Sequence, residues 1–352
     1  MKIRQLPFLA ALSWPMAALA TDVTDVPEGL YFHHHDWIVA CDNTLTCRAA
    51  GSAGNSDSTL SVLLTRAGGP NQSIIGQISL KPFDSQPQPE GPLSLRVQQR
   101  DLGVLATVKE TGIHLLSLKQ TAALLSALVR GGDIAVADTA GHAWPLSDKG
   151  AAAVLLKLDE YQGRLGTPGA VMRKGTKAES SVPAGLPTPL VRRAPTLAAA
   201  LDDPTLEMLA ASPTLRAALR APGNEPACEG LLKADPDLPI SNSPLTIQRL
   251  DAKHLLVSVP CWRAAHNSGD GYWVIHEQPP YRPIRVTGDA YLYEDGQILA
   301  ALRGLGPIDC ISEHRWTWNG TEFVLTSAVV GVMCRHVLDG AWQLPTRISE
   351  VR

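Results

Sequence analysis

The stretch that decides the fold covers residues 36–48 and reads DWIVACDNTLTCR. Every second residue from Trp37 to Cys41 falls on one face, at the period of two that is typical of a β-strand. Residues 42–44 are Asp, Asn and Thr, which favour a tight turn because Asp and Asn side chains hydrogen-bond to their own backbone. We therefore predict a hairpin whose second strand brings Cys47 back to within disulfide reach of Cys41.

The first 20 residues have the features of a secretory signal peptide. Lys2 and Arg4 give a charged start, residues 6–19 are largely apolar, and residues 18–20 (Ala-Leu-Ala) match a small-residue cleavage site. The alternative is an uncleaved anchor, but the apolar run is shorter than the ~20 residues that cross a bilayer, and no later segment reaches that length. The sequence predicts export to the periplasm or release, with no membrane span in the mature chain.

An exported chain enters an oxidising compartment, where cysteines form disulfides. The six cysteines allow many pairings, and proximity in the sequence favours three of them. These are Cys41–Cys47, Cys228–Cys261 and Cys310–Cys334. The alternative is a metal site, but the first pair matches no common zinc spacing and the other four cysteines are scattered.

Three consecutive histidines, His33 to His35, stand beside Asp36 and invite a comparison with metal sites. In a strand, His33 and His35 share one face and His34 lies on the other, so a three-ligand site needs a residue from elsewhere. We expect exposed histidines that lead into the strand, and we predict neither a metal site nor a cofactor.

Charge and composition exclude one class of partner and favour one class of fold. The net charge is -3 and the pI about 6.4, whereas nucleic-acid-binding domains carry a basic stripe. Charged residues make up only 18% of the chain, while 29 Gly and 27 Pro favour a loop-rich β protein. The 352 residues suggest two domains.

We predict an α+β fold of two β-rich domains with antiparallel sheets, each carrying a short helical element and held by disulfides. The first domain is expected over residues 21–174, with two helices. A Pro-rich linker follows over residues 175–198. The second domain is expected over residues 199–352, as a helical hairpin followed by an antiparallel β meander.

Local signals mark the expected helices. Ser117 and Gln120 form a capping box, and a row of apolar residues follows at helical spacing: Leu118, Ala122, Leu125 and Val129. Ser147 or Asp148 is expected to cap a second helix. Two further starts combine a capping residue with a first-turn proline, namely Asp203-Pro204 and Ser212-Pro213.

Residues 161–169, YQGRLGTPG, are rich in glycine, as phosphate-binding loops are. They lack the Gly-Lys-Ser/Thr ending, and they follow a helix instead of opening one. Their glycines are expected to end that helix and allow a tight turn.

Asp-Gly and Asn-Gly pairs mark the expected turns of the meander. They are Asp270-Gly271, Asp295-Gly296 and Asn319-Gly320. Such pairs favour type I′ hairpins, in which both central residues need positive φ.

Several motifs together resemble one bacterial family, the domain of unknown function numbered 1176. They are residues 37–43 (WIVACDN), 158–164 (LDEYQGR), 259–263 (VPCWR), 272–274 (YWV), 316–320 (WTWNG) and 340–346 (GAWQLPT), with Asn267 and Asp309-Cys310. Residues 263–267 and 304–309 depart from the family's pattern. The resemblance implies a secreted or periplasmic protein and no assigned activity. The first half also resembles the invasion-associated locus B proteins, through its Trp-to-Cys strand and the helix after Leu116.

Catalytic motifs are not apparent, and we predict no catalytic residues. There is no Gly-x-Ser-x-Gly elbow and no His-Glu-x-x-His pattern, and paired cysteines leave no thiolate. The preferred hypothesis is a non-catalytic binding or interaction module for an unknown protein or cell-envelope ligand, without nucleic acid. The candidate surface residues are Trp262, Asn267, Tyr272 and Trp342, although most aromatic residues are expected in the core. The alternatives are an inhibitor of a cell-wall hydrolase and a hydrolase with an unrecognised site.

Overall fold

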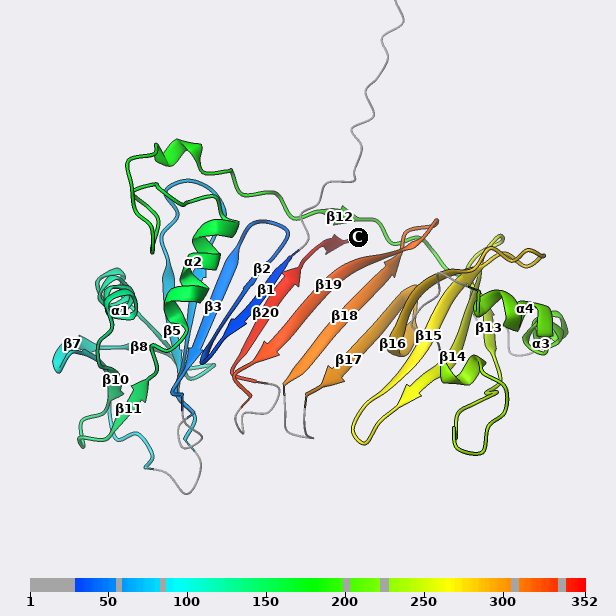
Figure 1. The fold of residues 1–352 in the computed structure, drawn as a ribbon, viewed down its shortest axis with the longest axis horizontal. Helices are drawn as coiled ribbons and strands as arrows, with labels where there is room; N and C mark the ends of the chain where they lie inside the picture. The colour runs from blue at the N-terminus through cyan, green and yellow to red at the C-terminus, as the bar shows by residue number, and fades with distance from the viewer. Residues whose placement is uncertain are drawn as a thin grey trace, which may run out of the picture.

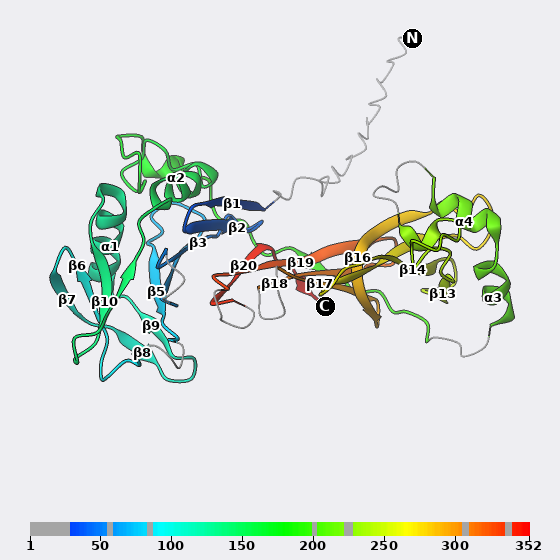
Figure 2. The same ribbon diagram turned by 60° about the horizontal axis from the view of Figure 1, so that its bottom comes forward.

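The computed structural model describes residues 29–54, 59–82, 87–198, 203–221, 228–304, 310–334 and 340–352. The expected signal peptide, residues 1–20, lies outside them. Within these ranges the chain is mostly antiparallel β-sheet with four α-helices, which confirms the predicted α+β class. The two ends of an elongated molecule carry the helices, with α1 and α2 at one end and α3 and α4 at the other (Figures 1 and 2). No helix in the described ranges is long and apolar enough to cross a membrane.

The N-terminal half contains a seven-stranded sheet and a four-stranded sheet. The larger sheet has the order β1-β2-β3-β4-β5-β9-β8 and the smaller one the order β11-β10-β6-β7. The strands are β1 (Leu30–His34), β2 (Trp37–Cys41), β3 (Cys47–Ser52), β4 (Ser61–Arg66), β5 (Ile75–Ser79), β6 (Ser94–Val97), β7 (Arg100–Val104), β8 (Ala106–Val108), β9 (Ile113–Leu115), β10 (Ile134–Ala137) and β11 (Ala143–Leu146). One hydrophobic core joins both sheets to the helices α1 (Leu118–Arg130) and α2 (Ala151–Tyr161).

The C-terminal half is one eight-stranded meander whose strands pair in sequence order. They are β13 (Thr246–Arg249), β14 (Leu255–Arg263), β15 (Ser268–Ile275), β16 (Ile284–Glu294), β17 (Gln297–Arg303), β18 (Ile311–Trp318), β19 (Phe323–Val332) and β20 (Trp342–Arg347). The helices α3 (Pro204–Ala210) and α4 (Pro213–Leu219) and the 3-10 turn η2 (Glu229–Leu231) cover one face near β13 and β14, around buried Leu215 and Trp273. The caps expected at Asp203 and Ser212 are confirmed, since each side chain accepts a backbone N–H of its helix.

Three disulfides hold the sheets. They join Cys41 to Cys47, Cys228 to Cys261 and Cys310 to Cys334, the three pairs that proximity in the sequence favours. Cys41 and Cys47 stand opposite each other in the β2–β3 hairpin, because residues 42–44 make the expected turn. Asp42 Oδ1 accepts the backbone N–H of Thr44 at 2.9 Å and so fixes that turn.

The two halves meet at an apolar cluster between β2–β4 and the last strands. Ala40, Ala50 and Leu63 pack there against Val332, Trp342 and Leu344. Residues 175–198, which we interpret as a linker, run back across the molecule (Figure 1) and form two short elements, the 3-10 turn η1 (Glu179–Ser181) and the strand β12 (Leu190–Val191). Strand β12 pairs in parallel with β21 (Glu350–Val351) near the C-terminus.

The cap expected for α2 is wrong. Gly150, at a φ of 95°, is the N-cap in place of Ser147 or Asp148, and no side chain caps the helix. The Ser147 hydroxyl instead donates to the Asp36 carboxylate at 2.6 Å. A Cβ on Gly150 would collide with the carbonyl oxygen of His34, so close approach of β1 requires glycine there.

Of the three expected turns, one has the expected type, one joins its two strands as expected but by a different type of turn, and one is not a turn. Asp295-Gly296 has positive φ at both residues, as a type I′ turn needs. Asn319 does not, because its side-chain Oδ1 accepts the backbone N–H groups of residues 321 and 322 and closes a longer loop. Asp270-Gly271 lies inside β15, where a Cβ on Gly271 would collide with the Cys261 sulfur.

Candidate functional site: a cavity beside helix α1

Helix α1 carries two apolar rows, and only one of them is buried. The capping box of Ser117 and Gln120 is present, so the helix begins where the sequence predicts. Leu124, Ala127 and Leu128 face the core. The other row is the one predicted from helical spacing, which begins at Leu118. It lines a cavity instead of the core, and Leu118 is 71% exposed. An apolar row that the fold leaves uncovered indicates a place where something else binds.

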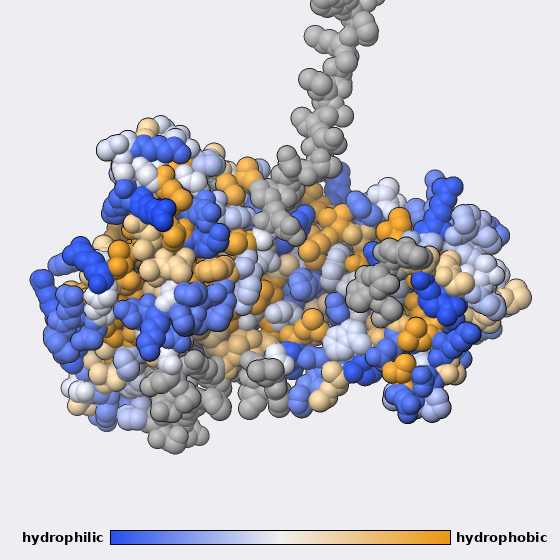
Figure 3. All heavy atoms as spheres, in the orientation of Figure 1, coloured by the Kyte–Doolittle hydropathy of each residue, from blue (hydrophilic) through white to orange (hydrophobic). Residues whose placement is uncertain are grey.

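The cavity has a volume of about 720 Å³, within the range of roughly 300–1,000 Å³ that is typical of small-molecule sites. We call it the α1 cavity. Three segments form its walls: the exposed row of α1, the β4–β5 connection, and the loop of residues 168–179. Its lining is Arg66, Asn71, Gln72, Ser73, Ile74, Leu118, Thr121, Ala122, Leu125, Ser126, Val129, Arg130, Pro168, Gly169, Ala170, Val171, Lys174 and Glu179. In Figure 3, apolar surface is visible in the region of α1 and α2, surrounded by hydrophilic side chains.

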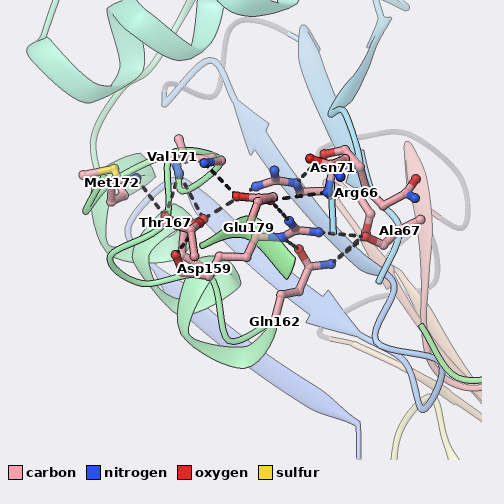
Figure 4. Close-up of polar contacts among 12 residues, drawn as sticks. Arg66, Ala67, Asn71, Asp159, Gln162, Thr167, Val171, Met172 and Glu179 are labelled. Carbon is pink, nitrogen blue, oxygen red and sulfur yellow. Dashed lines mark hydrogen bonds and ion pairs between the residues drawn. The ribbon is translucent and has the colours of Figure 1, made fainter. Parts of the chain in front are cut away.

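A buried network of charged groups lies beside the α1 cavity (Figure 4), and of these groups Arg66 and Glu179 line the cavity. We call this network the floor of the cavity. Arg164 is fully buried, and its Nη1 donates to Glu179 at 3.1 Å. Its Nε donates to Gln162 at 2.8 Å, and its Nη2 donates to the carbonyls of Ala67 and Gly69 in the β4–β5 connection. Arg164 therefore ties the end of α2 to two walls of the cavity, and its three nitrogens all have acceptors.

Glu179 reaches this network from η1. Its carboxylate accepts the amides of Gly169 at 3.1 Å and Asn71 at 3.3 Å, in addition to Arg164. Burial raises the pKa of the Glu179 carboxyl, but these donors overcome burial and hold it below its ordinary value. Glu179 therefore stays ionised and closes the loop of residues 168–179 over the network.

Asp159 lies beneath the same network and is fully buried in α2. Its carboxylate accepts the amide of Val171 at 2.8 Å and that of Met172 at 2.8 Å, so it anchors the second half of the loop. Burial raises the pKa of this carboxyl, while the two amides and Arg66 act in the opposite direction. The neighbouring Glu160 takes no part in the network and pairs with Lys157 at the surface.

Arg66 differs from Arg164 although both side chains are buried. Its Nε donates to the Gln72 carbonyl at 2.9 Å, but its Nη1 has no hydrogen-bond partner among the described residues. The nearest carboxylate, Asp159, lies 3.8 Å from that nitrogen, beyond hydrogen-bond length. Burial and the neighbouring Arg164 lower the pKa of Arg66 to about 10, so it remains charged at neutral pH.

The sequence identifies part of this site and misses the rest. Residues 161–169 do end helix α2, as predicted, but their Arg164 organises the cavity floor. Arg66 and Glu179 carry no sequence signal, since each stands alone in its own segment and they meet only in the fold.

The four residues proposed as a surface site do not come together. Tyr272 and Trp342 are buried in two different clusters, so they are not surface residues. Burial raises the pKa of Tyr272 to about 12. Trp262 is half-buried on a third cluster and donates to Asp289 at 2.9 Å. Asn267 exchanges two hydrogen bonds of 2.8 Å with the backbone of Arg303, which is a structural role.

The three histidines are exposed and lead into β2, as expected. His33 and His34 end β1 and are exposed, but His35 has a φ of 51° and makes the turn into β2. His33 and His35 therefore do not share a strand face. In the described part of the chain, no group of three or more His, Cys, Asp or Glu residues is arranged to hold a metal ion.

The comparisons with known proteins agree with the motif resemblance and add no activity. No curated protein and no solved structure matches the chain. The likeness to the invasion-associated locus B proteins stays a prediction. A family model described as a protein of unknown function (DUF1176) matches residues 31–349. The chain therefore belongs to the DUF1176 family.

Proposed function

We propose that this protein is an exported, periplasmic binding protein without catalytic activity, and that it binds its ligand in the α1 cavity. Export is supported by the three disulfides, which are typical of proteins outside the reducing cytosol. The observation that carries the proposal is the uncovered apolar row of α1 facing a floor of buried charge. Ligand sites characteristically combine apolar walls with a few well-placed polar groups.

The walls are held in place before any ligand arrives. Arg164 and Glu179 fix the β4–β5 connection against the loop of residues 168–179, and Asp159 fixes the rest of that loop. A preorganised cavity loses little conformational entropy on binding, which favours affinity. This rigidity suits a protein that holds a ligand.

A neutral fluorescent probe tests the proposal. N-phenyl-1-naphthylamine brightens in an apolar environment, and we expect it to bind the purified, oxidised protein with saturation. Ala122 is an exposed residue of the cavity row, so Ala122→Trp fills the space without disturbing the core. This variant should lose most of the signal. Ala152→Trp is the matched control, because Ala152 is exposed on α2 and outside the lining.

Either of two results would reject the proposal: no probe binding to the wild-type protein, or equal binding by Ala122→Trp and the control. Fractionation tests the location separately, since the oxidised chain should be released with the periplasm. The inhibitor and hydrolase alternatives stay predictions, and assays against lysozyme-like enzymes and model ester or peptide substrates address them.

A further inference from the structure

We infer that the ligand of the α1 cavity is an amphiphile with one anionic head group and an apolar chain, its head bound by Arg66 and its chain lying along α1. This inference rests on the proposed function and specifies the chemical class of its ligand. Four features of the cavity support it.

The first feature is the unmet hydrogen-bonding capacity of Arg66. Its side chain is only 6% exposed and lines the cavity, yet its Nη1 lacks a hydrogen-bond partner in the described structure. Leaving a buried charged donor unsatisfied is costly. A carboxylate or phosphate oxygen in the cavity would supply the missing acceptor, and the planar guanidinium is suited to such groups.

The second feature is that neighbouring groups are already occupied. The Asp159 oxygens accept backbone amides of the loop. Asp159 forms an ion pair with Arg66 Nη1, but their separation of 3.8 Å is too long for a hydrogen bond, so this nitrogen can still donate to another acceptor. Glu179 is neutralised by Arg164. The pairs of charges in the floor therefore leave this nitrogen of a cavity-lining side chain without a hydrogen bond.

The third feature is the charge of the lining. The lining contains one acidic residue, Glu179, and three basic residues: Arg66, Arg130 and Lys174. The chain as a whole has a net charge of -3, so the positive cavity is a local property. Such a concave, positive site attracts anions and repels cations.

The fourth feature is the apolar row. Leu118 and Val129 are eleven positions apart, which at 1.5 Å per helical residue gives a wall about 16 Å long. Thr121 lies along it, and its hydroxyl is a second buried polar atom without a partner in the described residues. A ligand with an apolar chain would cover this wall, whereas an inorganic anion would leave its apolar side chains exposed to water.

Competition against N-phenyl-1-naphthylamine tests the inference. The competitors share one chain and differ in the head group: decanoate, decyl phosphate, decanol and decyltrimethylammonium, each below its critical micelle concentration. We expect the better of the two anions to bind about tenfold more tightly than the cation, which corresponds to one charge-assisted hydrogen bond. The order of decanoate and decyl phosphate identifies the head group.

Variants then locate the anion. Arg66→Lys keeps the charge opposite Asp159 but shortens the donor, and should weaken anion binding about tenfold while decanol binding is unchanged. Lys174→Gln is the second variant, for the case that Arg66→Lys does not fold, because it changes a side chain at the surface. It should weaken anion binding about threefold. Lys177→Gln is its control, because Lys177 is also exposed but lies outside the lining.

The outcomes separate this inference from the proposed function. If the probe binds and anion and cation compete equally, the inference is wrong and the binding function stands. If the anion preference survives both Arg66→Lys and Lys174→Gln, the head group is not held as we infer. If the probe does not bind at all, the proposed function itself fails.

Discussion

Replacement of Arg164 by methionine should lower the free energy of unfolding by about 3–5 kcal/mol, the usual cost of removing one partner of a buried ion pair. The Arg164 side chain is fully buried and Glu179 is 17% exposed. Methionine fills much of the same space but leaves Glu179, Gln162 and two backbone carbonyls without their donor. Since domains are typically stable by about 5–15 kcal/mol, this loss is a large share of the total.

The surface pair of Lys157 and Glu160 is the matched control. Its N–O distance of 2.8 Å is shorter than the 3.1 Å of the buried pair, but the two side chains are 41% and 55% exposed. Lys157→Met should therefore cost less than about 1 kcal/mol. Urea unfolding monitored by tryptophan fluorescence measures both variants. Equal losses would refute the argument that burial, and not distance, sets the contribution of these pairs.

Three further predictions concern stability elsewhere in the chain. Replacing Cys228 and Cys261 by alanine removes a link between positions 33 residues apart, and should lower stability to urea by roughly 3–4 kcal/mol if loop entropy dominates; an unchanged midpoint would contradict this. Burial alone would raise the pKa of Asp138, but hydrogen bonds from two backbone amides and the His142 side chain lower it from 3.8 to about 2. Its stabilisation is therefore present above pH 4 and lost as the pH falls towards 2, and Asp138→Asn should flatten this part of a urea-midpoint profile against pH. Gly271→Ala should cost about 1–3 kcal/mol through the collision of its Cβ with the Cys261 sulfur, and a neutral result in thermal unfolding would show that β15 moves aside.

The features that sequence predicts correctly are local. Ser117 and Gln120 satisfy each other's backbone groups within one helical turn, so the start of α1 needs no tertiary contact. Cys41 and Cys47 are brought together by the turn between them. Asp203 caps α3 through an amide two positions away.

The failures arise where distant segments approach each other. Ser147 has the chemistry of a helix cap, but its hydroxyl donates a hydrogen bond to Asp36, which is far away in the sequence. Gly271 follows an aspartate, as turn glycines often do, yet it is needed because the Cys228–Cys261 disulfide passes over β15. In both cases a tertiary contact outweighs a local preference.

The sequence alone therefore indicates the β-rich class and the family and determines most helix starts, because the helix caps act within a few residues. It favours the three cysteine pairs, because each pair closes a shorter loop than the alternatives do. It does not determine which apolar row of α1 is covered, since Leu118 and Leu124 are equally apolar and only the packed sheets decide between them. Nor does it bring Arg66, Arg164 and Glu179 together. Their side chains meet because β4, the end of α2 and η1 converge in space. Once water is excluded, Arg164 pairs with Glu179, and Arg66 lies opposite Asp159.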